Sequence, residues 1–276
     1  MLLANNTVRR AGLLAEHGLS FWIEHGESRL LFDTGQGLVL RHNAAALGLD
    51  LHTVTDVVLS HGHYDHTGGL GQLAQLAGGQ PRLWMHPSAM RTRFSRHHDG
   101  SIHDIGMPAS SRESLDRFRL RNTDSGGKAV GILPGIFATG PIQRTQTGET
   151  IDGFFLDPEG QQPDDISDDQ ALWFDTDSGV VALLGCAHAG CINTLEQIQV
   201  QSGGRPLAAV IGGTHLGSAD SARLACAIDA LRRFAPRWLI PLHCTGDALP
   251  ILKNEFPSSC VLWGVGDGMT FSIKPL

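Results

Sequence analysis

The most informative stretch of this sequence is Leu59-Ser60-His61-Gly62-His63-Tyr64-Asp65-His66-Thr67-Gly68-Gly69. It places three imidazoles and one carboxylate within six residues, directly after the apolar stretch Val57-Val58-Leu59. A strand that ends there would deliver all four side chains to one edge of a sheet. Imidazole and carboxylate suit zinc, with manganese and iron as alternatives. Four ligands exceed the needs of one three-ligand catalytic site, so the spacing predicts two metals that share a water. The alternative is a His-rich surface loop, which would require neither this spacing nor the glycine pair.

Composition and charge narrow the class of protein. A chain of 276 residues, 41% hydrophobic and 18% charged, is long enough for one large domain or two small ones. The net charge of -7 provides no basic footprint for nucleic acid. Residues 1–18 show no signal peptide, and no segment is long and apolar enough to span a membrane. An odd number of cysteines without a C-x-x-C pair predicts reduced thiols and a cytoplasmic protein; they are Cys186, Cys191, Cys226, Cys244 and Cys260.

Hydrophobic patterning predicts two runs of strands, each followed by strand–helix alternation. The expected strands span residues 19–24, 28–33, 55–60, 82–86, 132–139, 171–175, 179–184, 207–211 and 238–240, and the expected helices span residues 38–47 and 219–234. Residues 88–130 are rich in arginine and are interpreted as an insertion with one or two short helices. Residues 153–169 are acidic and read as a loop. We therefore expect two sheets flanked by helices within one domain that spans residues 1–276.

Several segments, read in chain order, resemble a known family. They are Ala15–Ser20, Leu31–Gly35, the His-rich run, Asp168–Leu172, Gly185–Gly190, Gly212–Leu216 and Pro241–Gly246. The H-x-H-x-D-H run resembles the signature of the metallo-β-lactamase superfamily of metal-dependent hydrolases. The whole set is similar to the branch named after 7,8-dihydropterin-6-methyl-4-(β-D-ribofuranosyl)aminobenzene-5'-phosphate synthase. The resemblance implies an α/β (α+β) fold, a four-layer αββα sandwich with the site along one edge of its two sheets.

The resemblance also implies a set of metal ligands. His61 and His63 would bind one metal, and Asp65 and His66 would bind the other. His243 follows an apolar strand and matches the last metal-binding histidine of the superfamily, which would complete the second metal site. The alternative is a histidine that caps the next helix.

Two ligand positions depart from the superfamily pattern. The loop at residues 139–142 lacks the expected histidine, and Cys186 stands where a metal-bridging aspartate is usual. The branch pattern Gly-Cys-x-His suggests that His188 replaces the missing imidazole. Cys186 could bind metal as a thiolate, or it could be a small buried residue that fills a gap.

Other residues are candidates for the substrate side of the site. Asp65 and His215 are the candidate catalytic residues, and His215 is expected to act on the substrate rather than on metal. Asp33 matches a family aspartate that orients a ligand histidine, although a simple turn at a strand end would explain it too. Glu16 and His17 would line the substrate mouth or serve turn chemistry.

The predicted function is a dinuclear metal-dependent hydrolase with two divalent metal ions, Zn²⁺ or otherwise Mn²⁺ or Fe²⁺. Its partner would be a small-molecule substrate of phosphorylated or ester type, with anionic character suited to the arginines; a homo-oligomer is left open. The alternative is the transferase that the branch name implies, a pterin–arylamine condensing enzyme. A third hypothesis is a non-hydrolytic metal-binding or redox module, against which the intact ligand run argues.

Overall fold

The computed structural model describes residues 1–97, 99–149 and 151–274. The chain divides into two compact units that interleave along the sequence. Unit 1 consists of Met1–Thr123, Asp152–Asp168 and Gly264–Met269. Unit 2 consists of residues 124–151, 169–263 and 270–276, of which the structure describes all but 150 and 275–276. The single domain expected over residues 1–276 stays a prediction.

Unit 1 is built on a mixed sheet. In the described residues this sheet has six strands in the order β1-β2-β3-β4-β5-β8. The strands β1 to β3 are antiparallel, and β3, β4, β5 and β8 run parallel. Their bounds are β1 Leu2–Ala4, β2 Ser20–His25, β3 Ser28–Phe32, β4 Asp56–Val58, β5 Arg82–Met85 and β8 Arg119–Asn122. The parallel arrangement places the carboxyl ends of β3 and β4 side by side, which positions the residues that follow them.

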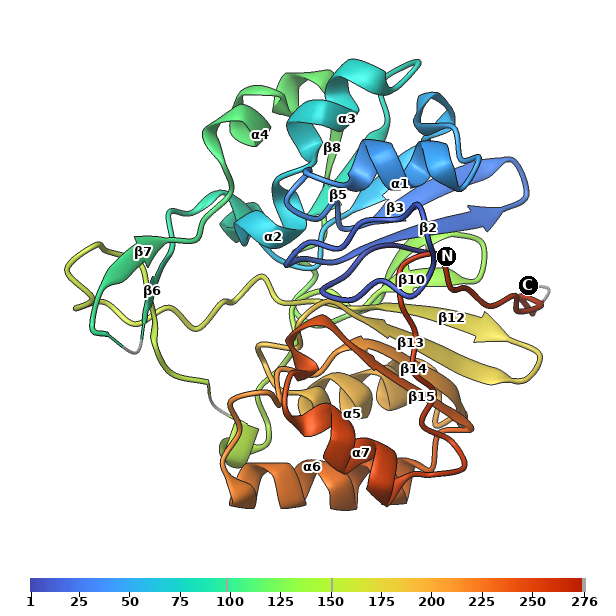
Figure 1. Cartoon of the computed structure of the whole chain (residues 1–276). Coiled ribbons are helices and arrows are strands. Elements are labelled where there is room, and N and C mark those ends of the chain that lie inside the picture. Colours follow the sequence, from blue (N-terminus) through green and yellow to red (C-terminus); the bar gives the residue numbers. More distant parts are fainter. Residues whose placement is uncertain (98, 150, 275–276) are drawn as a thin grey trace. The chain divides into compact units, whose positions relative to one another are not determined.

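Helices cover one face of this sheet and complete the core of unit 1 (Figure 1). The helices of the unit are α1 Leu40–Ala46, α2 Tyr64–Thr67, α3 Leu70–Leu76 and α4 Ala109–Glu113. Leu40 of α1 and Leu73 of α3 are fully buried against Leu31, Val57 and Leu83 of the strands. Burying such a side chain contributes about 1.5–3 kcal/mol, so this face holds the metal-loop end of β4 in place.

The arginine-rich segment 88–130 contains more strand than predicted. It carries the expected short helix α4, but also β8 and a hairpin of β6 Phe94–Arg96 and β7 Ile102–Asp104. The strand β11 Phe154–Phe155, from the predicted acidic loop, pairs with β6 to form a small sheet in unit 1 (Figure 1). The prediction missed β6, β7 and β8 because polar and charged residues dominate them, and it missed β11 because that strand has only two residues. Residue 98 lies outside the described residues.

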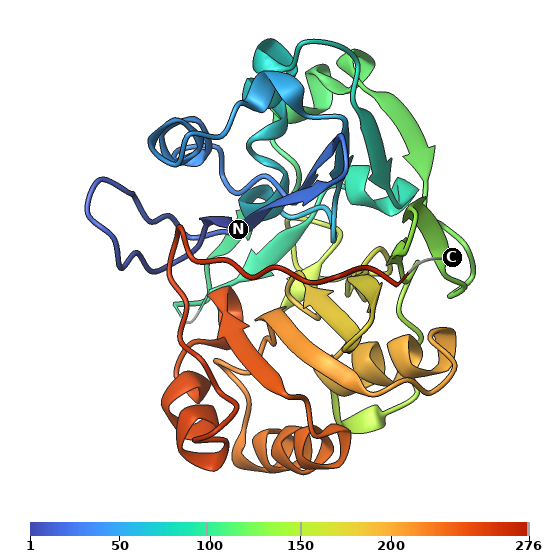
Figure 2. The ribbon, with the colours of Figure 1, turned by 90° about the vertical axis from the view of Figure 1, so that its right-hand side faces the viewer.

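Unit 2 contains the second mixed sheet, which has six strands in the described residues, in the order β15-β14-β13-β12-β10-β9. The neighbours β13, β14 and β15 are parallel and lie side by side from yellow through orange to red (Figure 2). The bounds are β9 Val130–Leu133, β10 Ile136–Ala138, β12 Leu172–Thr176, β13 Gly179–Leu184, β14 Leu207–Gly213 and β15 Trp238–Leu242. A single strand was predicted over residues 132–139. This was wrong, because Gly135 adopts a φ of 71° and turns the chain into a β9–β10 hairpin.

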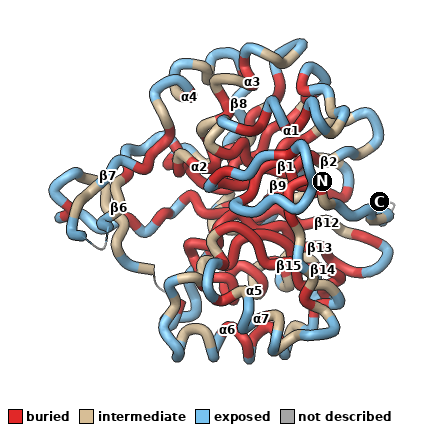
Figure 3. Tube along the Cα trace, viewed as in Figure 1, coloured by how far each residue is buried: buried red, intermediate tan, exposed pale blue. Residues whose placement is uncertain are grey.

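Three helices pack on one face of the unit 2 sheet (Figure 1). They are α5 Cys191–Gln201, α6 Ser221–Phe234 and α7 Ala248–Glu255. Their apolar faces meet the strands through Leu195, Leu231 and Leu252, each at most 2% exposed. Burial is concentrated on the strands of each unit's own sheet and on these inward helix faces (Figure 3). In the described part of the chain, no helix is both long and apolar enough to cross a bilayer.

Candidate metal centre

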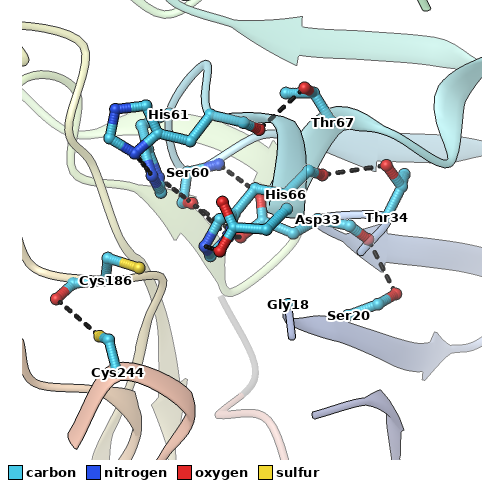
Figure 4. Close-up of polar contacts among 12 residues, drawn as sticks. Gly18, Ser20, Asp33, Thr34, Ser60, His61, His66, Thr67, Cys186 and Cys244 are labelled. Carbon is cyan, nitrogen blue, oxygen red and sulfur yellow. Dashed lines mark hydrogen bonds and ion pairs between the residues drawn. The ribbon is translucent and has the colours of Figure 1, made fainter. Parts of the chain in front are cut away.

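The His-rich run occupies the carboxyl end of β4 in unit 1. Asp33 follows the neighbouring parallel strand β3, so its carboxylate lies beside the same loop (Figure 4). The four ligand candidates of the run, His61, His63, Asp65 and His66, are at most 6% exposed. Burying three imidazoles and a carboxylate costs free energy unless each group is hydrogen-bonded, ion-paired or bound to metal. The hydrogen-bond partners of each ring therefore indicate which of its nitrogen atoms could bind a metal.

Asp33 fixes the orientation of two histidines, His66 directly and His61 through Ser60. Its Oδ2 lies 2.6 Å from His66 Nδ1 and accepts a hydrogen bond from Ser60 Oγ at 2.7 Å. Because that bond uses the only hydroxyl proton of Ser60, the oxygen must accept from His61 Nδ1, which lies 2.9 Å away. Both rings therefore carry their protons on Nδ1, and the unprotonated Nε2 atoms of His61 and His66 face His63 and Asp65 respectively.

The potential donor atoms of unit 1 form two close pairs. His61 Nε2 lies 3.0 Å from His63 Nδ1, and His66 Nε2 lies 3.6 Å from Asp65 Oδ2. Two ligands of one tetrahedral zinc, each at 2.0–2.1 Å, are separated by about 3.3 Å. Both separations are therefore compatible with ligands that share a divalent metal ion.

Close backbone packing holds the ligand loop. The His66 carbonyl accepts hydrogen bonds from the Thr34 amide at 2.7 Å and from the Thr34 hydroxyl at 2.9 Å (Figure 4). Gly69 is required in this packing, because a Cβ there would lie only 2.4 Å from the Thr34 carbonyl oxygen. The glycine pair that follows the run therefore lets the loop after β3 contact the loop after β4.

Sequence reasoning missed a buried ion cluster that anchors the same loop. The Asp168 carboxylate accepts a hydrogen bond from the Gly62 amide at 2.8 Å and binds the Arg93 guanidinium through both of its oxygens. Arg93 Nε lies 3.0 Å from Asp164 Oδ2, and all three charged side chains are nearly inaccessible to solvent. Burial raises the pKa of Asp164, and the nearby Arg93 opposes that shift. The cluster fixes the loop between His61 and His63, although its members are far apart in sequence.

Glu16 and His17 lie on opposite sides of their loop. The buried Glu16 carboxylate accepts hydrogen bonds from the amides of Gln36, Leu38 and Val39, which precede α1. Burial raises its pKa, and these amides oppose the rise. By contrast, the half-exposed His17 points its Nε2 at Asp65 Oδ2, 3.2 Å away. Glu16 organises backbone, and only His17 contacts a ligand candidate.

In unit 2, each of three neighbouring parallel strands is followed within four residues by a histidine. His188 follows β13, His215 follows β14, and His243 follows β15. The rings of His188 and His215 are 4.5 Å apart between centroids. The carboxyl ends of neighbouring parallel strands share one sheet edge, where α/β proteins commonly bind ligands. The sheet of unit 2 therefore gathers the predicted ligands His188 and His243 and the predicted catalytic His215 at one edge.

Hydrogen bonds within unit 2 hold the His188 loop. Asp169 Oδ2 accepts from the Ala189 amide at 2.7 Å, and the Asn193 side chain donates to the Ala189 carbonyl at 2.7 Å. The buried Glu149 carboxylate accepts from the amides of Ile192 and Asn193 at the start of α5. Burial raises the Glu149 pKa, and those two amides oppose the rise. The loop is therefore rigidly tied to the helix that follows it.

Two cysteines lie close to His243. The potential ligand atoms of Cys186, His243 and Cys244 lie within 4.8 Å of one another. The Cys244 thiol donates to the Cys186 carbonyl at 3.5 Å and accepts from the His215 amide at 3.3 Å (Figure 4). All five cysteines lie in the described part of the chain and carry free thiols.

Backbone strain marks the ligand loops. Of the described residues, six that are not glycine have a positive φ, and they include Asp33, Ala187, His215 and His243, at 58°, 57°, 49° and 49°. Such conformations cost about 1–3 kcal/mol each and persist where the surrounding structure enforces them. Each of these four residues follows the carboxyl end of a strand, so the strain sits where the candidate site residues are.

These features define a class of protein. A family model of the metallo-β-lactamase superfamily matches residues 14–196, and the chain belongs to that superfamily. This confirms the predicted family and its α/β fold, and it implies a divalent-metal enzyme.

Individual relatives agree with this class. The chain is 28% identical over 242 residues to 7,8-dihydropterin-6-methyl-4-(β-D-ribofuranosyl)-aminobenzene-5'-phosphate synthase of Methanocaldococcus jannaschii, covering 84% of this chain and 82% of that protein. It is 27% identical to a second, uncharacterised protein of the same organism, covering 89% and 90% of the two chains. The crystal structure of Tm1679, described as a metal-dependent hydrolase of the β-lactamase superfamily, matches with a TM-score of 0.83 and 28% identity over 98% of each chain.

Proposed function

We propose that this protein is a dinuclear metal-dependent hydrolase of a phosphorylated or ester-type small molecule. The observation that carries the proposal is the buried set of His61, His63, Asp65 and His66. Ser60 and Asp33 engage the Nδ1 atoms of His61 and His66, so that the Nε2 atoms of these two rings face the other members of the set. Divalent metals at such a site supply Lewis acidity toward a substrate oxygen and an activated water at neutral pH.

The chain's own residues would hold and orient the reactants. We propose that His188 and His243 complete the ligand set, as the family pattern implies. His215 would transfer a proton to the leaving group of an anionic small-molecule substrate. The free thiols support a cytoplasmic enzyme, and zinc is the proposed metal because imidazole and carboxylate suit it.

The alternative function is a transferase that joins a pterin to a phosphorylated arylamine. It is favoured by the similarity to the M. jannaschii synthase, which spans most of both chains. The two functions separate in one assay panel. Phosphoester, lactone and thioester substrates test the hydrolase, and a dihydropterin incubated with an aminobenzene ribofuranosyl phosphate tests the condensation. Turnover confined to the second mixture would replace hydrolysis by condensation.

Metal stoichiometry tests the ligand set without a known substrate. Replacing His63 or Asp65 by Ala should lower bound metal to one equivalent or less, because each change removes a donor from one of the two pairs. The measurement is metal analysis of the dialysed protein, with His86→Ala, whose side chain caps the turn after β5, as a matched control. Two equivalents retained in both variants would falsify the assignment.

A further inference from the structure

We propose that Cys186 and Cys244 bind metal as thiolates together with His243, so that the metal at His243 has a sulfur-rich ligand set. This inference rests on the proposed metal-dependent function and extends it. The sequence pattern left the role of Cys186 open between ligand and gap-filling residue and assigned no role to Cys244. In unit 2, Cys186 follows β13, and the consecutive residues His243 and Cys244 follow β15. Their potential ligand atoms converge, and Figure 4 shows the two cysteines beside each other.

The separation of the ligand atoms fits a shared ion. Two thiolates bound to one tetrahedral zinc at about 2.3 Å lie about 3.8 Å apart. The sulfur atoms of Cys186 and Cys244 and a ring nitrogen of His243 are all within 4.8 Å of one another, so small side-chain rotations would bring them to a common centre. Two thiolates and one imidazole are donors that select zinc or another soft ion over manganese.

The backbone around the sulfur atoms is arranged for this role. Gly213 lies so close that a Cβ there would be 2.7 Å from Cys244 Sγ, so the sulfur sits directly against the end of β14. The His215 amide donates a hydrogen bond to the same sulfur at 3.3 Å, which holds the sulfur in place. Metal binding would release the thiol proton that now contacts the Cys186 carbonyl.

The backbone next to these residues is held in a fixed, uncommon conformation. His243 and His215 have φ values of 49°, and Ala187, next to Cys186, has 57°. Cys186 and His243 are 3% and 7% exposed, and Cys244 is partly exposed, so the site is largely shielded but still reachable from solvent. The other buried cysteines, Cys191 and Cys260, offer a direct comparison because they lie away from this group.

Cobalt and cadmium can reveal the thiolates independently of activity. Metal-free protein reconstituted with Co²⁺ alone should show the intense near-ultraviolet sulfur-to-cobalt charge-transfer band. Cys186→Ser and Cys244→Ser should each weaken the band, and the double variant should abolish it. The matched controls Cys260→Ser, at a buried cysteine, and Cys226→Ser, at an exposed one, should retain it in full.

The experiment distinguishes a failure of the proposed thiolate ligands from a failure of the proposed metal-dependent function. Wild-type protein that binds two cobalt ions without the band would overturn the thiolate ligands and leave the dinuclear enzyme standing. A band that survives in the double variant would also overturn them. Protein that binds no metal would reject the proposed function as well. If the serine variants fail to fold, the ¹¹³Cd resonance of the wild-type protein decides: a downfield shift typical of two sulfur ligands supports the proposal, and one typical of nitrogen and oxygen alone rejects it.

Discussion

Asp33 shows how one side chain can set the chemistry of several others. It lies at the start of a hydrogen-bond relay that reaches His66 directly and His61 through Ser60. The family resemblance points to Asp33, but Ser60 has no motif of its own. The role of Ser60 becomes visible only in the structure, where its single hydroxyl proton goes to Asp33 and its oxygen therefore accepts a hydrogen bond from His61.

Replacing Asp33 by Asn should weaken metal binding about 10- to 100-fold, the usual effect of losing a group that orients a ligand. Asn tolerates the positive φ of this residue, so the change removes charge without adding backbone strain. Competition with a chelator measures the effect. Asp50→Asn, in an exposed cap of a short helical turn, is the control. Unchanged affinity in the Asp33 variant would show that the imidazoles are oriented by other contacts.

His215 should act on substrate, so its loss should spare the metals. The substitution His215→Asn keeps a residue that accepts the φ of 49° and keeps the amide that faces Cys244. We expect turnover to fall on the order of 100-fold or more while both metals remain bound. Rates with the best substrate of the panel, together with metal analysis, check this. Lost metal would make His215 a ligand, and full activity would make it structural.

At the scale of elements, the sequence predicted correctly those helices and strands whose hydrophobic residues recur with a clear local period. The hairpin of β2 and β3, the helix α1 and the strands β12 and β13 lie where hydrophobic periodicity put them. The prediction failed where pairing partners are remote and polar, as in β8, whose four residues are all exposed. Arg93 was missed for the same reason, because Asp168 lies 75 residues away in sequence. The β9–β10 turn, by contrast, was readable from Pro134-Gly135.

Removing Arg93 should destabilise unit 1, because it leaves two buried carboxylates without their cation. Arg93→Ala should lower the free energy of unfolding by about 3–5 kcal/mol at neutral pH. Urea denaturation measures it, with Arg119→Ala on exposed β8 as the control. A loss equal to that of the control would show that the cluster contributes no net stability.

The free energy of unfolding that Arg93→Ala loses should also depend on pH. Burial already raises the pKa of Asp164, and Arg93 opposes that rise, so the variant raises it further. A carboxyl whose pKa is higher in the folded state binds more protons there, so its contribution to stability falls as pH rises from the unfolded value through the folded one. The deficit of Arg93→Ala relative to wild type should therefore be smaller near pH 5 than at pH 7.

At the scale of the whole molecule, the two units could not have been inferred from the sequence, because neither is continuous along it. The last described stretch illustrates this. Residues 264–269 belong to unit 1, where the Leu2 amide donates to the Asp267 carbonyl at 2.8 Å. Residues 270–274 belong to unit 2, where the Lys274 amide donates to the Asp175 carbonyl at 2.8 Å. Local patterning carries no signal for such a division.

Two truncations should separate the contribution of residues 264–269 to the stability of unit 1 from the contribution of residues 270–274 to the stability of unit 2. Deleting residues 270–276 removes the bonds from Asp177 to Ser272 and from Lys274 to Asp175, so stability should fall by about 1–3 kcal/mol. Deleting residues 264–276 also removes the unit 1 bonds and should cost clearly more. Urea unfolding of both variants beside wild type gives the two losses. Equal losses would show that residues 264–269 contribute nothing to unit 1.

The interleaving has a consequence for synthesis on the ribosome. Domains generally fold as they emerge, amino-terminal parts first. Here β1 receives its contacts with residues 264–269 only after the long stretch of chain between them has been made. The edge of the first sheet must therefore wait, exposed to chaperones and to neighbouring nascent chains, until residues 264–269 have emerged.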